Sequence, residues 1–177
     1  ISSGVKEIID GSAIADKFMR IYGCSFHYDD EGRAIWPCQV ANYTTKTQFL
    51  FRINKGILDI SKDEELNKYT PEDDRPVPFR NMIYIADGPS DVPAFSVIKG
   101  RGGATFAIYP KGNKEAFEQV ERLREDGRID MFAEANYSDN TTASMWICNK
   151  IREFAERIKQ EEQAKREGNN TTPTHLV

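Results

Sequence analysis

Residues 81–91 read NMIYIADGPSD, and this stretch decides the fold. Its first six residues form a compact apolar run of the kind found in β-strands that are buried on both faces. The next five, Asp87 to Asp91, contain glycine and proline and end the strand in a turn. A helix-length segment, a glycine-rich turn and a second apolar run at residues 104–109 follow. The order predicts two parallel strands joined by a helix.

Strand and helix signals also alternate on both sides of this unit. The expected elements are a strand end running into a helix at residues 1–19 that is interrupted near Gly11, a hairpin at 24–40, a helix from Thr44 or Thr45 to Ile53, a short helix and loop at 63–78, a helix at 92–98, a helix at 113–124, a short strand at 129–133 and a long helix at 142–165. Such alternation predicts an α/β fold with a doubly wound, Rossmann-like, mostly parallel sheet.

Length and charge restrict the class of protein. The 177 residues suit one domain, and we expect residues 1–166 to form it and residues 167–177 to be a disordered tail. A formal net charge of -4 argues against a nucleic-acid partner. The sequence contains neither a long apolar run nor a signal-peptide pattern, which favours a cytoplasmic protein without a membrane partner. The three cysteines, without metal-ligand spacing, are expected to be reduced.

Two groups of residues are candidates for binding phosphate. The turn Ser2-Ser3-Gly4 offers hydroxyls and backbone N–H groups before a helix, where an anion is favoured, although such turns also serve as ordinary caps. Lys46 supplies a positive charge at the start of another predicted helix, where a lysine is usually a solvated surface residue. Ligands of doubly wound sheets bind beyond the carboxyl ends of the strands, which is where these groups are expected.

Two carboxylates follow the strand of the opening stretch. Asp87 and Asp91 are four positions apart and offer the oxygen ligands that Mg²⁺ prefers. The same letters also fit an Asp-Gly turn followed by an aspartate that caps the next helix. Sequence spacing alone leaves both interpretations open.

Taken in order, these groups resemble motifs II, III and IV of the haloacid dehalogenase superfamily of phosphohydrolases, in particular its members similar to phosphoserine phosphatase. The resemblance spans roughly residues 1–137, and the fourth motif is its most specific part. Those members have Ser-Gly-Gly and Gly-Asp-Gly-x-x-Asp, where this chain has Ser2-Ser3-Gly4 and Ala86-Asp87-Gly88-Pro89-Ser90-Asp91. Ala86 departs from the usual glycine, and either serine fits the motif hydroxyl.

The resemblance implies a role for each of these residues in a Mg²⁺-dependent phosphomonoesterase with a small phosphorylated substrate. Ser2 would hydrogen-bond the transferring phosphoryl group, with the backbone of Ser3 and Gly4 nearby. Lys46 would neutralise phosphoryl charge and hold the nucleophile. Asp87 would ligate Mg²⁺, and Asp91 would bind it directly, bind it through water, or orient Lys46.

The resemblance also implies that essential parts lie outside this chain. The family's motif I, Asp-x-Asp, supplies the nucleophile that forms an aspartyl-phosphate, and no Asp-x-Asp here follows an apolar strand. Its strand would lie in the middle of the sheet, so we expect an incomplete sheet, a C-terminal portion of a longer enzyme, and no hydrolysis by this portion alone. Any large cap that selects substrate would also lie in the missing part.

Two further expectations follow from the incomplete sheet. An unpaired strand edge favours association, either with a second copy or with the missing N-terminal segment. The alternative function is a non-catalytic α/β module, in which the same residues only bind a phosphorylated ligand or a partner.

Overall fold

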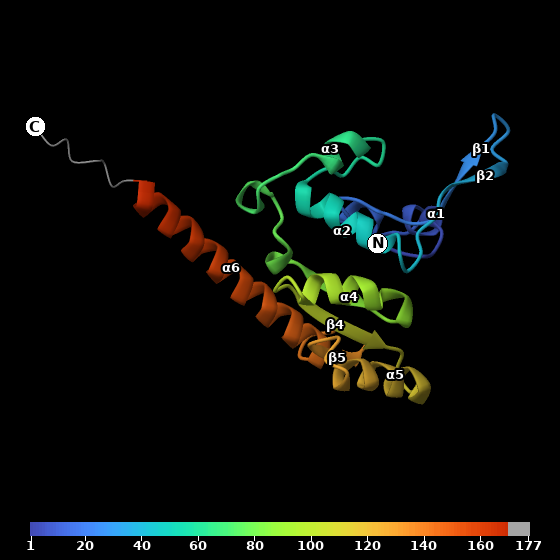
Figure 1. The fold of residues 1–177 in the computed structure, drawn as a ribbon. Coiled ribbons are helices and arrows are strands. Elements are labelled where there is room, and N and C mark those ends of the chain that lie inside the picture. The colour runs from blue at the N-terminus through green and yellow to red at the C-terminus, as the bar shows by residue number, and fades with distance from the viewer. Residues whose placement is uncertain (170–177) are drawn as a thin grey trace, which may run out of the picture. The chain divides into compact units, whose positions relative to one another are not determined.

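The structure, a computed structural model, describes residues 1–169, and these divide after Phe132 into two compact units (Figure 1). Each unit is described by itself below. Residues 167–169, which were predicted to belong to a tail, are part of a helix. The rest of the predicted tail, residues 170–177, lies outside the described residues.

A three-stranded parallel sheet confirms the predicted α/β class. Its strands are β3 (Ile83–Ala86), β4 (Ala104–Tyr109) and β5 (Met131–Glu134), in the order β3-β4-β5. Residues Ile83 to Ala86 pair in parallel with Ala104 to Ala107. The helix α4 (Val92–Lys99) joins β3 to β4, as the opening stretch of sequence predicts.

Helices cover both sides of β4. Figure 1 shows α4 on one side of this strand and α5 (Lys114–Glu125) on the other. The first four residues of β4 are buried accordingly. The turn into β4 is tight, because a Cβ on Gly103 would lie 2.5 Å from the Phe79 carbonyl oxygen. The core of this unit consists of Leu50, Phe79, Met82, Tyr84, Ala94, Phe95, Ile98, Ala107, Val120 and Ile129.

The strand β3 is only partly buried, which corrects the prediction that both of its faces are covered. Tyr84 is buried, whereas Ile85 remains 36% exposed. The reason is topological: in the described chain, β4 is the sheet neighbour of β3, and its other edge has none. An apolar run therefore lies at the edge of a sheet.

The N-terminal segment contains less regular structure than predicted. The helix α1 (Lys6–Asp10) ends at Gly11, and only a 3₁₀ turn, η1 (Ala15–Lys17), follows. The predicted strand end at residue 1 is absent from this described segment, where an isolated parallel bridge joins Val5 to Cys24. The predicted hairpin is confirmed as antiparallel β1 (Ser25–Tyr28) and β2 (Ala34–Gln39).

The helix α2 (Lys46–Lys55) carries the candidate lysine at its first residue. Its start is fixed by Asn42, whose side-chain oxygen accepts hydrogen bonds from the backbone N–H groups of Thr44 and Thr45, rather than by a threonine cap. Gly56 follows the last residue of the helix and caps it in the left-handed conformation. After it come α3 (Asp63–Asn67) and two 3₁₀ turns, η2 (Glu72–Asp74) and η3 (Phe79–Asn81).

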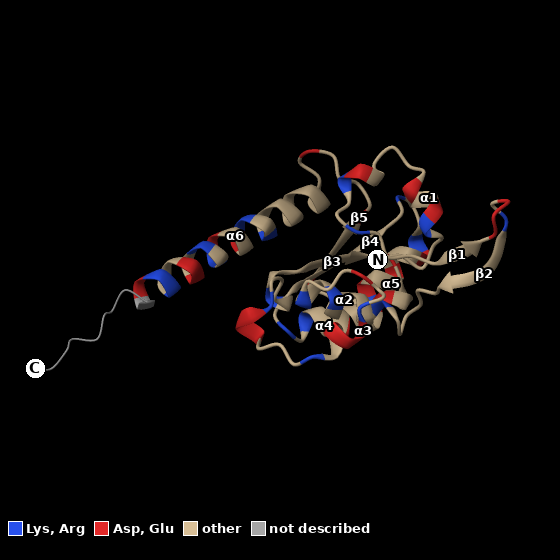
Figure 2. Cartoon of the chain, turned by 90° about the horizontal axis from the view of Figure 1, so that it is seen from above, with Lys and Arg blue, Asp and Glu red and all other residues tan. Residues whose placement is uncertain are grey.

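The second unit contains one long helix, α6 (Thr142–Asn169). Figure 2 shows that basic and acidic residues alternate along much of its length, as expected for a solvated helix. Lys150 and Glu153 form one such ion pair, 2.7 Å apart. Over residues 1–169, none of the helices combines the length and the apolar character that crossing a bilayer requires.

Candidate functional site

One polar cavity brings together every residue that the sequence predicted for the site. It has a volume of about 380 Å³ and lies beyond the carboxyl end of β3. Its lining consists of Ile1, Ser2, Ser3, Gly4, Lys46, Ile85, Ala86, Asp87, Ser90, Asp91 and Ile108. The groups that the sequence places beyond the carboxyl ends of the strands therefore line one cavity, although Ser2 and Asp91 are far apart in the sequence.

A buried ion pair forms one wall of this cavity. The Nζ atom of Lys46 lies 2.8 Å from Oδ1 of Asp91, and the two residues are 4% and 3% exposed. Lys46 also donates to Ser90 Oγ at 3.2 Å, and Ser90 Oγ donates to Asp91 Oδ2 at 3.2 Å. The lysine is therefore not the solvated surface residue that is usual at such a position.

The contacts of Asp91 argue against one of the two interpretations of its sequence, that of an ordinary helix cap. Asp91 occupies the N-cap position of α4, yet its side chain makes no capping hydrogen bond to that helix. Its two carboxylate oxygens instead accept from Lys46 and Ser90, which line the cavity. An ordinary capping role would leave the carboxylate on the N–H groups of α4. The geometry fits a residue that orients Lys46.

Tyr84 is a member of this cluster that the sequence analysis missed. Its hydroxyl donates to Asp91 Oδ1 at 2.5 Å from within β3. Burial raises the pKa of Tyr84, and the hydrogen bond to Asp91 raises it further, so the hydroxyl remains protonated and able to donate. A signal was available: Tyr84 carries the one side-chain polar atom in the run Met82 to Ala86, and a buried tyrosine hydroxyl usually has a partner.

The turn at Ser2 forms another part of the lining. Ser2 N–H donates to the Tyr22 carbonyl at 2.8 Å, and Ser2 Oγ accepts from Gly4 N–H at 3.0 Å. The hydroxyl proton of Ser2 is then left to donate to a ligand. The predicted contribution of a helix dipole is wrong, because α1 has only five residues and begins at Lys6, beyond the turn.

Asp87 is the carboxylate most open to a cation. It lines the cavity, is exposed, and accepts no hydrogen bond from residues 1–169. Mg²⁺ is commonly held by one or two carboxylates, with water and phosphate oxygens completing six ligands. Asp87 supplies one such carboxylate at this cavity. Within the described residues, no three His, Cys, Asp or Glu side chains gather as a complete metal site.

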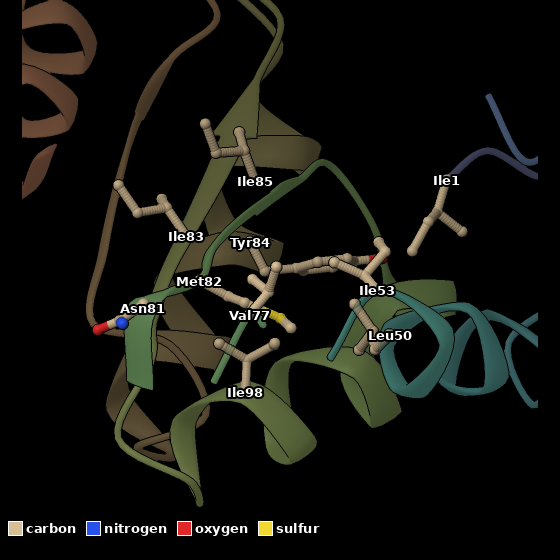
Figure 3. A pocket seen from close by; sticks show the side chains of 10 residues that line it. All are labelled: Ile1, Leu50, Ile53, Val77, Asn81, Met82, Ile83, Tyr84, Ile85 and Ile98. Carbon is tan, nitrogen blue, oxygen red and sulfur yellow. The ribbon is translucent and has the colours of Figure 1, made fainter. Parts of the chain in front are cut away.

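A second, apolar cavity of about 430 Å³ lies along the open edge of β3. Figure 3 shows Ile83 and Ile85 of β3 on one side of it, and Ile1 with Leu50 and Ile53 on the other. Val77, Asn81, Met82, Tyr84 and Ile98 complete the lining. We call this cavity the edge groove. Ile1, Ile85 and the neighbouring Tyr84–Asp91 contact connect it to the polar cavity.

The fold and the site define an α/β protein with a polar, lysine-containing cavity at the carboxyl edge of a parallel sheet. The chain is similar to an uncharacterized protein of Borreliella burgdorferi (strain ATCC 35210 / DSM 4680 / CIP 102532 / B31), with 32% identity over 168 residues. The match covers 85% of this chain and 56% of that protein, so the chain spans a little over half the length of this relative. No protein-family model matches the chain, and no solved structure matches it.

Proposed function

We propose that the polar cavity is part of the active site of a Mg²⁺-dependent phosphomonoesterase of the haloacid dehalogenase superfamily. The observation that carries this proposal is the convergence of Ser2, Lys46 and Asp87 on one cavity. Phosphoryl transfer needs positioned cations and hydrogen-bond donors more than it needs acid–base groups. Lys46 and Ser2 are of that kind, and Asp87 is a carboxylate that would hold a metal cation. The longer Borreliella relative agrees with a parent protein larger than this chain.

Each residue of the cavity has a role in this proposal. The ammonium group of Lys46 faces a phosphate from a position fixed by Asp91, and so stabilises negative charge. The hydroxyl of Ser2, whose oxygen already accepts from Gly4, donates to a phosphate oxygen. The backbone at Ser3 and Gly4 forms the rest of this wall.

Asp87 would hold Mg²⁺, with Asp91 acting through water or through Lys46. Bound there, Mg²⁺ would supply a second positive charge for the phosphate oxygens. The protein side of this arrangement is the exposed carboxylate of Asp87 beside the buried Lys46–Asp91 pair. Opposite charges are thus arranged around a space that suits a phosphate ester and a cation.

The aspartate nucleophile of the proposed mechanism belongs to a strand outside residues 1–177. The edge groove supports this part of the proposal, because it combines an unpaired strand edge with an apolar lining. On its far wall, residues near Ile1 are themselves paired: Ser2 N–H donates to Tyr22 O, and Cys24 N–H donates to Gly4 O. A strand in the groove would lie between these hydrogen-bonded residues and β3, and it would end beside Lys46.

The proposal is tested by complementation. The chain of residues 1–177 is incubated with an aryl phosphate and Mg²⁺, alone and together with the separately expressed segment that precedes it in the parent reading frame. We expect hydrolysis only in the mixture, because losing a covalent nucleophile costs several powers of ten in rate. Lys46→Met should abolish the recovered activity, and Lys17→Met, at an exposed residue, is the control.

The outcome also separates the enzyme from a non-catalytic phosphate- or partner-binding module. A mixture that binds phosphate through Lys46 but hydrolyses no ester would favour the binding module. Hydrolysis by residues 1–177 alone, abolished by Asp87→Asn, would instead contradict the proposal that the nucleophile lies outside this chain.

A further inference from the structure

We propose that Tyr84 is a positioning residue of the polar cavity: through Asp91 it holds the ammonium group of Lys46 where a phosphate can meet it. This inference rests on the proposed function, since it concerns the same cavity. It adds a residue that lies on the buried side of the site and that does not itself line the polar cavity.

The contacts of Asp91 support this role. Its Oδ1 atom accepts from two donors, Lys46 Nζ at 2.8 Å and Tyr84 OH at 2.5 Å. Hydrogen bonds to a charged acceptor are short and strong, and both partners here are withdrawn from water. The Asp91 carboxylate thus binds the Lys46 ammonium group and is itself held by the Tyr84 hydroxyl, which comes from β3.

The tyrosine itself has little freedom to move. Tyr84 is 9% exposed, lies within β3, and packs edge-on against Phe95, with ring centroids 5.4 Å apart. Its hydroxyl is a fixed point because the strand and the core fix the ring. A carboxylate bound to it cannot turn about its own side chain without losing a buried hydrogen bond.

Removal of the hydroxyl has one main consequence for Lys46, and it opposes phosphate binding. The carboxylate of Asp91 is released to rotate, and Nζ of Lys46 is no longer held in one place. The lysine then becomes a poorer partner for an anion in the cavity.

The test measures the affinity of the full chain for inorganic phosphate and the exchange rate of the Lys46 ammonium protons by nuclear magnetic resonance. Tyr84→Phe should weaken phosphate binding about threefold to tenfold, which is in the usual range of coupling between residues in contact, here Tyr84 and Asp91. It should also speed the exchange of the Lys46 ammonium protons. Tyr22→Phe is the matched control, since Tyr22 is also buried and donates to the Leu58 carbonyl at 2.7 Å. It should change neither measurement.

A double-mutant cycle tests whether Tyr84 acts through Asp91. In the Asp91→Asn background, Tyr84→Phe should produce no further change in phosphate affinity. An equal loss in both backgrounds would overturn the proposed route. The same cycle on ammonium exchange gives an answer that does not depend on phosphate.

Lys46→Met separates the failure of this inference from the failure of the proposed function. If Lys46→Met leaves phosphate affinity unchanged, the phosphate site is wrong. If Lys46→Met abolishes binding while Tyr84→Phe matches the wild type in affinity and in ammonium exchange, the phosphate site stands and the role of Tyr84 is wrong. Circular dichroism shows whether the Tyr84→Phe variant folds. If it does not fold, the exchange rate of the Lys46 ammonium protons in Asp91→Asn decides, and slow exchange in that variant would overturn the inference.

Discussion

Lys46 and Asp91 are charged side chains that the fold keeps almost entirely out of water. Burying a lysine and an aspartate costs free energy, and their mutual attraction offsets this only with good geometry and further hydrogen bonds. Tyr84 and Ser90 provide those bonds here. An apolar pair of the same size would serve stability as well, so the distinguishing property of the ion pair is that it places a positive charge at a cavity wall.

Replacing one partner of this pair should be costly. Lys46→Met leaves the Asp91 carboxylate buried without its cation, and we expect a loss of about 3 kcal/mol in the free energy of unfolding. Urea unfolding of the full chain measures it. The double variant Lys46→Met with Asp91→Leu should recover part of the loss. A single variant that costs no more than Lys17→Met, at an exposed lysine, would contradict the buried pair.

Asp87 should control the binding of Mg²⁺. Asp87→Asn keeps the size of the side chain and removes the charge that a hard cation needs, so Mg²⁺ affinity should fall about tenfold or more. Titration calorimetry with Mg²⁺ alone measures this on the full chain. Asp91→Asn should have a milder effect, because both Asp91 oxygens already accept hydrogen bonds. Unchanged Mg²⁺ affinity in the Asp87 variant would remove that residue from the site.

At the scale of elements, Asp130 joins three parts of the first unit just before β5. It accepts hydrogen bonds from the backbone and the hydroxyl of Thr105 in β4, at 2.8 and 2.9 Å, and lies 3.0 Å from Lys99 Nζ at the end of α4. Partial burial raises the pKa of Asp130, but the bonds from Thr105 and Lys99 outweigh it and hold the pKa below its ordinary value of 3.8. Folding therefore favours the ionised carboxylate.

This link predicts a dependence of stability on pH. The stabilisation from Asp130 is present above its ordinary pKa of 3.8 and is lost as pH falls through the lower pKa of the folded state. Asp130→Asn should therefore be less stable than the wild type near about pH 6, and the difference should shrink near about pH 3. Urea unfolding at both values measures it. A difference that grows in acid would contradict the ion pair.

The order of elements could be predicted from sequence because apolar periodicity and turn residues are local properties. The strand at Ile83, the helix stop at Gly56 and the hairpin all follow from such signals. The exposure of Ile85 could not be predicted in the same way, since it depends on which strand is a neighbour. The hydrogen bond from Tyr84 to Asp91 likewise forms only because the turn after β3 folds back on that strand. The spacing of the two residues in the sequence does not predict this.

The candidate site, too, could be predicted only in part from the sequence. Sequence order and the family resemblance singled out Ser2, Lys46 and Asp87 as candidates, and the structure brings them together. Sequence order was not enough to decide whether Asp91 caps α4 or faces the cavity, because an aspartate in either position has the same letters around it. The direction of one side chain distinguishes them.

At the scale of the whole molecule, we expect the open edge of β3 to be a surface for association. Unpaired N–H and C=O groups together with exposed apolar side chains favour pairing with another strand. We expect light scattering of the full chain to show association that increases with concentration. Ile85→Lys should suppress it, because a charge on an edge strand opposes pairing. Ile8→Lys, at a 74% exposed residue of α1, is the control, and an equal effect of both would contradict the edge as the contact.

The helix α2 is anchored at both of its ends. Lys46 ties its first turn to Asp91, while toward the other end Arg52, 1% exposed, donates to the carbonyls of Asp59 and Ile60 and pairs with Asp63. Asn54 adds a bond to the Val77 carbonyl at 2.9 Å. Because it is held near both ends, the helix resists both rotation about one end and translation along its axis. The position of the Lys46 ammonium group in the cavity can then change only through the torsion angles of its own side chain. The location of the charge therefore varies only as far as one side-chain rotamer allows, and not by the movement of a whole helix.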